Sequence, residues 1–211
     1  NISNYRGSAT NIVLVEGSVE VTDKNEKKAQ LAPHDLLNIA DGTIVIGHVG
    51  RFSFVKNQEF LIEVLSLVKQ RNIDVKLMLI GTGETLHEIR DLVKVRDLEN
   101  EVLFVGAIPN VYDYMQAMDI FAFPSRWEGL GMVGVEAQAI GMPVVASTAV
   151  PISMKLVDDV VFLSLDDINA WLGGLNRDVL KSHVNNTDIM SAYISKAPFI
   201  LEQKHIPFNT F

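Results

Sequence analysis

The sequence predicts an α/β protein in which a parallel sheet carries helices on both faces. From residue 43 onward, short apolar segments rich in Val and Ile alternate with amphipathic segments of helical period, the pattern of repeated β-α-β units. Several apolar segments end at a glycine, which marks a turn before the next helix. With 211 residues, of which 48% are hydrophobic and 21% charged, the chain is long enough for one domain with a substantial core.

Residues 1–43 precede this regular pattern. Residues 11–15 and 19–22 predict two short strands on either side of a turn at Glu16-Gly17-Ser18. The lysine-rich residues 23–28 predict a solvated loop, and residues 33–39 predict one or two helical turns. We therefore assign residues 1–43 to a linker with the first strands of the domain, and residues 44–211 to the main domain.

The main domain is predicted to contain short apolar strands with amphipathic helices between them. The predicted strands are residues 43–49, 76–80, 102–105, 120–123, 144–146 and 160–163. The first helix has one apolar face made of Phe60, Leu61, Val64, Leu65 and Val68, and the second has Leu86, Ile89, Leu92 and Val93. The predicted helices are 58–71 with Asn57 as its cap, 84–96, 111–118, 133–140, one that Asp166 or Asp167 caps and that ends near residue 175, and 188–203, which Pro198 should kink or divide within the carboxyl-terminal segment 188–211.

The most informative stretch, residues 119–146, reads as a strand, a loop, a helix and a second strand. Its loop carries Glu128, and its helix carries Glu136 in the early turns. Loops that leave the carboxyl ends of parallel strands form the ligand crevice of such sheets, so both carboxylates can face one pocket. The amides of Gly129, Leu130 and Gly131 lie beside the helix start, where unpaired N–H groups and the helix dipole favour an anion. The glutamate pair is weak evidence alone, because a loop acid and a surface helix acid give the same spacing.

Two cations are predicted at the same edge of the sheet. Arg51 and Lys56 follow the first strong strand, where they could neutralise the charge of a pyrophosphate together with helix-start amides. Taken alone, they read more simply as two solvated charges. Gly81-Thr82-Gly83 follows the next strand, and as an isolated Gly-x-Gly it also fits an ordinary tight turn.

Composition excludes several classes of function. A net charge of -8 argues against a nucleic-acid partner. The chain has no cysteine, which excludes disulfides and thiolate metal sites and permits a reducing cytosol. The most apolar long stretch, residues 132–152, is broken by polar residues, glycine and proline, so it is no bilayer span, and no signal peptide opens the chain. The histidines show no metal-ligand spacing, and His48, inside an apolar strand, is expected to be a packed core residue.

Three segments, in order, resemble one family. PSRWEGLGMVGVEAQAIGMPVVA resembles the E-x7-E segment of retaining glycosyltransferases of the two-domain GT-B architecture, the family-4 or group 1 type. VGRFSFVKN resembles that family's V-G-R-[LF]-x-x-x-K-[NG] segment. Gly81-Thr82-Gly83 resembles its G-x-G loop, where missing side chains allow close approach to the donor. The resemblance covers about residues 44–166 and implies a Rossmann-like donor-binding domain, the carboxyl-terminal half of a GT-B fold.

The resemblance implies a role for each candidate residue. Arg51 and Lys56 would bind the donor diphosphate and stabilise its departure, where negative charge develops. Glu128 would contact the transferred sugar, assisted by the amides of residues 129–131. Glu136 would accept hydrogen bonds from the two ribose hydroxyls, for which an ionised carboxylate has the acceptor capacity. The implied donor is a UDP- or GDP-linked sugar, and the family needs neither a metal nor a further cofactor.

The implied parent enzyme moves a sugar to a glycan or lipid-linked acceptor in capsular or extracellular polysaccharide synthesis. It would be cytoplasmic, and the resemblance leaves open a peripheral association with the inner face of the membrane. The amino-terminal half of a GT-B enzyme, which carries the acceptor site, is expected to be missing from these 211 residues, so the chain alone should transfer no sugar.

Two alternative functions stay open. One is another enzyme of the same architecture, a nucleotide-sugar epimerase or a glycan phosphorylase, although a phosphorylase would need a pyridoxal lysine site that is not found. The other is a nucleotide-sugar-binding module without chemistry. The resemblance is also incomplete, because Glu16-Gly17-Ser18 stands where the family has N-G-[IV], and STAVPISMKLVDDV lacks the family's glycine-rich turn and glutamate. We therefore assign no sugar or base contact to residues 147–160. Trp127 fits either a pocket wall or packing at the sheet edge.

Overall fold

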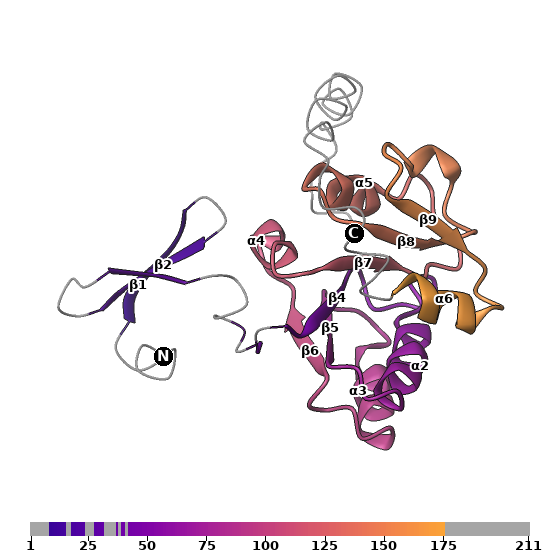
Figure 1. Cartoon of the computed structure of the whole chain (residues 1–211), viewed down its shortest axis with the longest axis horizontal. Coiled ribbons are helices and arrows are strands. Elements are labelled where there is room, and N and C mark those ends of the chain that lie inside the picture. Colours follow the sequence, from indigo (N-terminus) through magenta and orange to yellow (C-terminus); the bar gives the residue numbers. More distant parts are fainter. Residues whose placement is uncertain are drawn as a thin grey trace.

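The computed structural model describes residues 9–15, 18–23, 28–31, 37, 39–40 and 42–175. Its centre is a parallel sheet of six strands in the order β6-β5-β4-β7-β8-β9 (Figure 1). The strands are β4 (Ile44–Val49), β5 (Val75–Ile80), β6 (Val102–Gly106), β7 (Ile120–Phe123), β8 (Val144–Ser147) and β9 (Val160–Leu163). The predicted α/β class is confirmed. The predicted helix at 188–203 lies outside the described residues.

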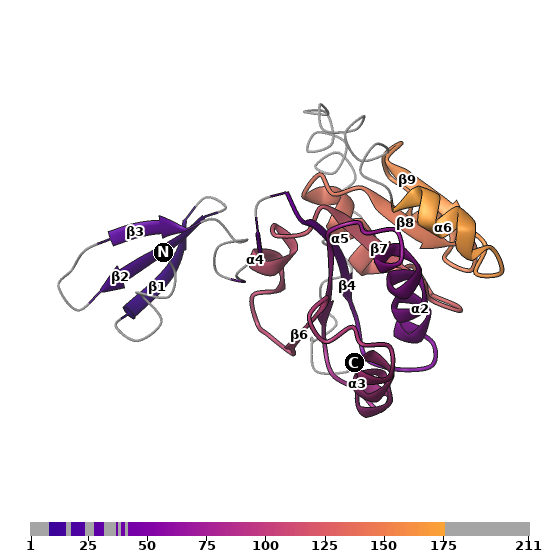
Figure 2. The same ribbon diagram turned by 60° about the horizontal axis from the view of Figure 1, so that its bottom comes forward.

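Helices cover both faces of this sheet. One face packs against α2 (Gln58–Lys69), α3 (Leu86–Val95) and α6 (Ile168–Gly174), and the other against α4 (Val111–Met115), α5 (Met132–Ala139) and the 3-10 turn η2 (Ile152–Met154) (Figure 2). Successive residues of β4 face opposite layers, since Ile44 and Ile46 pack in the first and Val45 in the second. Burial on both faces explains why the strands read as continuous apolar runs.

The strand order reverses direction between β4 and β7. From β4 the chain runs outward through β5 and β6, and from β7 it runs outward the other way through β8 and β9. In an open parallel sheet, such a switch point opens a crevice beyond the carboxyl ends of the two central strands. The loops after β4 and after β7 border this crevice, and they carry the predicted cations and Glu128.

The amino-terminal strands form a separate antiparallel sheet, β1 (Ala9–Val15), β2 (Ser18–Asp23) and β3 (Lys28–Leu31). The first two were predicted and β3 was not. The stretch predicted to be a loop, residues 23–28, begins and ends in strands, because β2 ends at Asp23 and β3 begins at Lys28. The prediction was wrong at these two residues because it weighed only side-chain polarity. An edge strand is held by main-chain hydrogen bonds to its neighbour and commonly carries lysine.

The two predicted helix caps have different outcomes. Asp167 is the N-cap of α6, and its carboxylate accepts a hydrogen bond from the amide of Ala170 at 3.0 Å. Asn57 stands at the N-cap position of α2, but its side chain makes no capping hydrogen bond. Its backbone is left-handed, with φ 58° and ψ 43°, and its side chain turns to the loop after β7 instead. The position was therefore right and the predicted contact wrong.

Candidate functional site at the carboxyl edge of the sheet

The loop after β4, residues 50–57, lies between two other loops and is hydrogen-bonded to both. On one side, the amide of Phe52 donates to the carbonyl of Thr82 at 2.9 Å, and the amide of Thr85 donates to the carbonyl of Phe52 at 3.3 Å. On the other side, the amide of Arg126 donates to the carbonyl of Val55 at 2.8 Å. Loops that follow β4, β5 and β7 are thereby joined into one continuous edge.

Lys56 and Glu128 form an ion pair at this edge. The Lys56 Nζ lies 2.6 Å from Oε1 of Glu128, although the two residues are 72 positions apart. The buried Ser125 donates its hydroxyl to the same oxygen at 2.7 Å, and Lys56 Nζ lies 5.4 Å from the centre of the Phe123 ring. Only 23% of the Lys56 side chain and 11% of the Glu128 side chain are exposed, so the pair is shielded from solvent. The structure thus brings together a cation and an acid that were assigned to adjoining parts of one ligand.

Arg51 is more exposed and also has an acidic partner. Its Nε lies 3.0 Å from Oε2 of Glu84, and both side chains are more than half exposed. The pKa of the Glu84 carboxyl lies below its ordinary value, first because its own backbone amide hydrogen-bonds to it, and then because of Arg51. A solvated pair of this kind exchanges partners at little cost. Arg51 is therefore free to turn from Glu84 to an incoming anion.

The glycines of the next loop are explained by main-chain packing. A Cβ on Gly81 would lie 2.1 Å from the carbonyl oxygen of Gly50, and one on Gly83 would lie 2.2 Å from that of Phe52. Gly81 and Gly83 also have positive φ values of 134° and 158°. The close approach that these glycines permit here is to the loop after β4, and it holds that loop against its neighbour.

The loop after β7 leads into α5 through Gly131. This residue is the N-cap of the helix and is left-handed, with φ 75° and ψ 48°, and a Cβ there would lie 3.0 Å from the ring of Phe123. Gly129 and Leu130 are exposed just before it, at the crevice edge. Glu136 lies in the second turn of α5 and is half-buried. Glu128 and Glu136 thus occupy the loop and helix positions predicted for them.

Several residues around the pair were not assigned to the site from the sequence. Ser125 orients Glu128, Asn57 bonds to the loop after β7, and Arg126 bonds back to the loop after β4. All lie inside the two segments that resemble the family, but nothing in their spacing indicates contacts between segments about 70 positions apart. Trp127, 55% exposed, packs against Phe54, 62% exposed, with ring centres 6.0 Å apart, so it contacts the neighbouring loop.

His48 is a core residue, as predicted. It is fully buried, its Nδ1 lies 2.9 Å from the carbonyl oxygen of Ala122, and its Nε2 lies 3.2 Å from the Gln58 amide nitrogen. Burial lowers the pKa of His48 to about 4, opposed by the Ala122 hydrogen bond and aided by the positive charge of Lys56. It is therefore neutral at pH 7 and does not add to the positive charge of the site.

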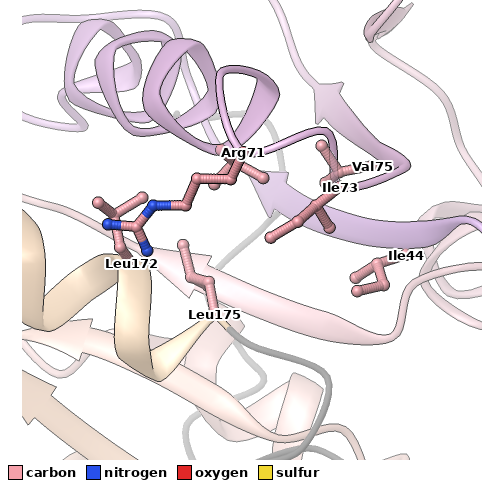
Figure 3. Close-up of a pocket in the computed structure, with 7 residues that line it drawn as sticks. Ile44, Arg71, Ile73, Val75, Leu172 and Leu175 are labelled. Atoms are coloured by element: carbon pink, nitrogen blue, oxygen red, sulfur yellow. The ribbon is translucent and has the colours of Figure 1, made fainter.

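A small apolar pocket of ≈ 40 Å³ lies at the opposite edge of the sheet, where β4 and β5 begin (Figure 3). It is lined by Ile44, Val68, Arg71, Ile73, Val75, Leu172 and Leu175. Its position at the amino ends of the strands separates it from the crevice.

Within the described ranges, no three His, Asp or Glu side chains are grouped as a metal site, and no helix is long and apolar enough to span a bilayer.

Known proteins are similar to about half of this chain. The putative glycosyltransferase EpsF of Bacillus subtilis is 39% identical over 112 residues, which cover 53% of this chain and 29% of EpsF. The capsular polysaccharide biosynthesis glycosyltransferase CapM of Staphylococcus aureus is 33% identical over 117 residues, 54% of this chain and 30% of CapM. The chain therefore matches less than a third of the length of either relative.

The fold is similar to that of the Anabaena protein HepE, whose crystal structure contains UDP-glucose. The TM-score is 0.62 at 26% identity, over 80% of this chain and 51% of HepE. The parallel sheet and its switch point therefore follow the Rossmann-like half of a GT-B glycosyltransferase. The family described as Glycosyl transferases group 1 matches residues 33–190, most of the chain and all of the six-stranded sheet. This protein belongs to the group 1 glycosyl transferases.

Proposed function

We propose that this chain is the donor-binding domain of a retaining glycosyltransferase. The enzyme transfers a sugar from a nucleoside diphosphate sugar, UDP- or GDP-linked, to a glycan or lipid-linked acceptor. The observation that carries this proposal is the shielded Lys56–Glu128 pair at the switch point, which sets a cation beside an acid at the crevice. The UDP-glucose in HepE supports a nucleotide sugar as the ligand, and the name of CapM supports capsular or extracellular polysaccharide as the product.

Each residue of the site is proposed to bind a different part of the donor. Lys56 and Arg51 neutralise the diphosphate, and the negative charge that grows on it as the sugar leaves is stabilised by the same cations. Glu128 lies 2.6 Å from Lys56 and so reaches the sugar next to the phosphate. The amides of Gly129, Leu130 and Gly131, which follow Glu128 directly, assist it at the sugar. Glu136 accepts hydrogen bonds from the ribose. Gly81 and Gly83 contribute by letting the loop after β4, which carries both cations, pack against the loop after β5.

Donor binding also requires that existing ion pairs open. Lys56 is held by Glu128, and Arg51 by Glu84. A diphosphate replaces both carboxylates with more highly charged oxygens, and a released Glu128 then becomes available to the sugar hydroxyls. No metal or cofactor is part of this proposal. We also propose that the parent enzyme works in the cytoplasm, at the inner face of the membrane where lipid-linked acceptors are presented.

Calorimetry with purified chain tests the proposal. We expect UDP or GDP to bind more tightly than the corresponding monophosphate. Arg51→Ala and Lys56→Ala should each weaken the binding free energy of the diphosphate by about 1.5–3 kcal/mol, the range for hydrogen bonds to charged groups. Lys69→Ala is the matched control, because Lys69 forms a similar pair with Glu101 at 3.1 Å on the amino side of the sheet. Equal affinity for diphosphate and monophosphate, unchanged in the crevice variants, would contradict the proposal.

The same measurement separates the two glutamates. Glu136→Ala should weaken the binding of UDP and of UMP alike, because the proposed partners of Glu136 are ribose hydroxyls. In this variant, 2′-deoxy-UDP should bind almost as tightly as UDP, because the shared contact is already lost. Glu128→Ala should bind UDP at least as tightly as the native chain, because it frees Lys56 from its competing carboxylate. If Glu128→Ala weakens free UDP, Glu128 contacts the nucleotide and not the sugar.

A further inference from the structure

Arg126 bridges the two loops that carry Lys56 and Glu128. Its amide donates to the carbonyl of Val55 at 2.8 Å, and its Nε donates to the carbonyl of Phe54 at 3.1 Å. Its Nη2 donates to Oδ1 of Asn57 at 2.8 Å, and the guanidinium lies 4.3 Å from the centre of the Phe54 ring. One residue of the loop after β7 therefore contacts three residues of the loop after β4.

Asn57 completes the bridge from the other side. Its Nδ2 donates to the carbonyl of Pro124 at 3.1 Å, while its Oδ1 accepts from Arg126, so both ends of the buried amide bind the loop after β7. Its left-handed backbone, φ 58°, is a conformation that non-glycine residues adopt at a cost. The contacts with Pro124 and Arg126 offset this cost and keep the chain turned directly after Lys56.

These contacts surround the ion pair. Lys56 lies between Val55 and Asn57, which both bond to the opposite loop, and Glu128 follows Arg126 by two residues. The position of the Lys56 amine relative to the Glu128 carboxylate is therefore set by the bridge as well as by the pair itself. Arginine suits this task because its planar fork donates in two fixed directions, which a lysine ammonium does not reproduce.

We propose that Arg126 is a positioning residue, which together with Asn57 clamps the loop after β4 to the loop after β7 and so preassembles the donor site. This inference rests on the proposed function of Lys56 and Glu128. Arg126 acts through those two residues and does not itself touch the donor. Without the clamp, the loop carrying Lys56 must be ordered on binding, and that entropic cost reduces affinity.

Calorimetry with UDP and GDP on the 211-residue chain provides the first test. Arg126→Ala should raise the Kd of the diphosphate about tenfold, the effect of about 1.4 kcal/mol. Arg126→Lys keeps the charge but loses the fork, so it should bind as weakly as Arg126→Ala. Asn57→Gly removes the amide while keeping a residue that accepts positive φ, and it should weaken binding to a similar degree. Arg90→Ala is the control, because Arg90 stacks on Phe104 at the same 4.3 Å but joins α3 to β6, which lies two strands away from β7.

Combining the two clamp variants gives a sharper result. If Arg126 and Asn57 act as one device, the double variant should lose little more affinity than either single variant. Full additivity would show two independent effects and would overturn the inference. Full recovery of affinity in Arg126→Lys would also overturn it, because the residue would then contribute charge and not geometry.

Hydrogen exchange gives a readout that needs no ligand. The amide of residue 126, bonded to Val55, should exchange at least about tenfold faster in Arg126→Lys and in Asn57→Gly than in the native chain, because local opening becomes easier. Unchanged exchange in both variants would overturn the clamp. The two proposals fail separately: a native chain that binds neither UDP nor GDP refutes the proposed function, whereas native binding that Lys56→Ala weakens and Arg126→Ala leaves intact refutes only the role of Arg126.

Discussion

His48 has its chemistry set by burial. Its ring stacks on Phe121 with centres 6.2 Å apart and is enclosed between β4, β7 and the first residue of α2. Because the Ala122 carbonyl can only accept, Nδ1 carries the proton and Nε2 accepts from Gln58. A protonated ring would lose its hydration and lie near the positive Lys56, which is why the pKa of His48 falls to about 4.

This lowered pKa makes the fold sensitive to acid. In the unfolded chain the pKa of His48 is 6.5, above its folded value of about 4, so protonation favours unfolding. The contribution to stability is complete above pH 6.5 and is lost as the pH falls from 6.5 toward 4. Between about pH 7 and pH 4.5 we expect the free energy of unfolding to drop by roughly 2–3 kcal/mol more in the native chain than in His48→Asn.

Urea unfolding at the two pH values measures this difference. His48→Asn keeps an N–H donor for Ala122 but has no titrating ring, so carboxylates elsewhere contribute equally to both proteins. Parallel pH dependence in the two proteins would mean that His48 is protonated in the fold or is not buried as described.

At the scale of elements, the site is formed by loops that pack against one another through their main chains. The loop after β5 reaches the loop after β4 only because Gly81 and Gly83 present no side chain. Hydrogen bonds then join Phe52 to Thr82 and Thr85. The strands fix where each loop starts, and these contacts fix how the loops lie at the crevice.

Gly81→Ala should therefore destabilise the domain by about 2–4 kcal/mol, because the new methyl would overlap the Gly50 carbonyl in a positive-φ backbone. Gly173→Ala in α6 is the matched control. Apart from its own turn of the helix, no heavy atom lies within 4 Å of its added Cβ, so alanine should be neutral or stabilise the helix by up to about 1 kcal/mol. Urea midpoints compare the two variants. A midpoint for Gly81→Ala equal to that of the native chain would show that the loop can move away without cost.

At the scale of the whole molecule, a chain of net charge -8 is proposed to bind an anion. The charge of the crevice, and not the net charge, decides this, because surface charges more than about 8–10 Å away are largely screened at physiological salt. The crevice brings Arg51 and Lys56 to the carboxyl edge beside amides of the loop before α5. Affinity for a diphosphate therefore does not require a positive net charge.

The final prediction concerns transfer. The chain covers 51% of HepE and 29% of the relative EpsF, and transfer needs donor and acceptor positioned together. We expect the purified 211-residue chain to bind the donor without measurable sugar transfer to a glycan acceptor. A coupled assay of UDP release with acceptor present, and a second without it, measures this. Multiple turnovers by the chain alone would contradict the expectation.

The elements of the sheet and the candidate residues could be read from the sequence by itself. Hydrophobic periodicity is a local property, so it located every strand from β4 to β9 and identified Asp167 among two possible caps of α6. The segments around Arg51, Lys56 and Glu128 were found because their residue types and order are also local. The contacts of these side chains could not be predicted from the neighbouring residues in the sequence.

The tertiary structure alone decided the contacts of the site. The sheet places β4 beside β7, although these two strands are not consecutive in the chain. Lys56 therefore meets Glu128, and Asn57 meets Arg126. Asn57 had the sequence of a cap, yet a partner 69 positions away outcompeted the local hydrogen bond. Gly81 and Gly83 signalled only a turn until the loop after β4 lay against them. Local pattern determines which face of an element is buried, whereas strand order determines which polar groups meet across the crevice.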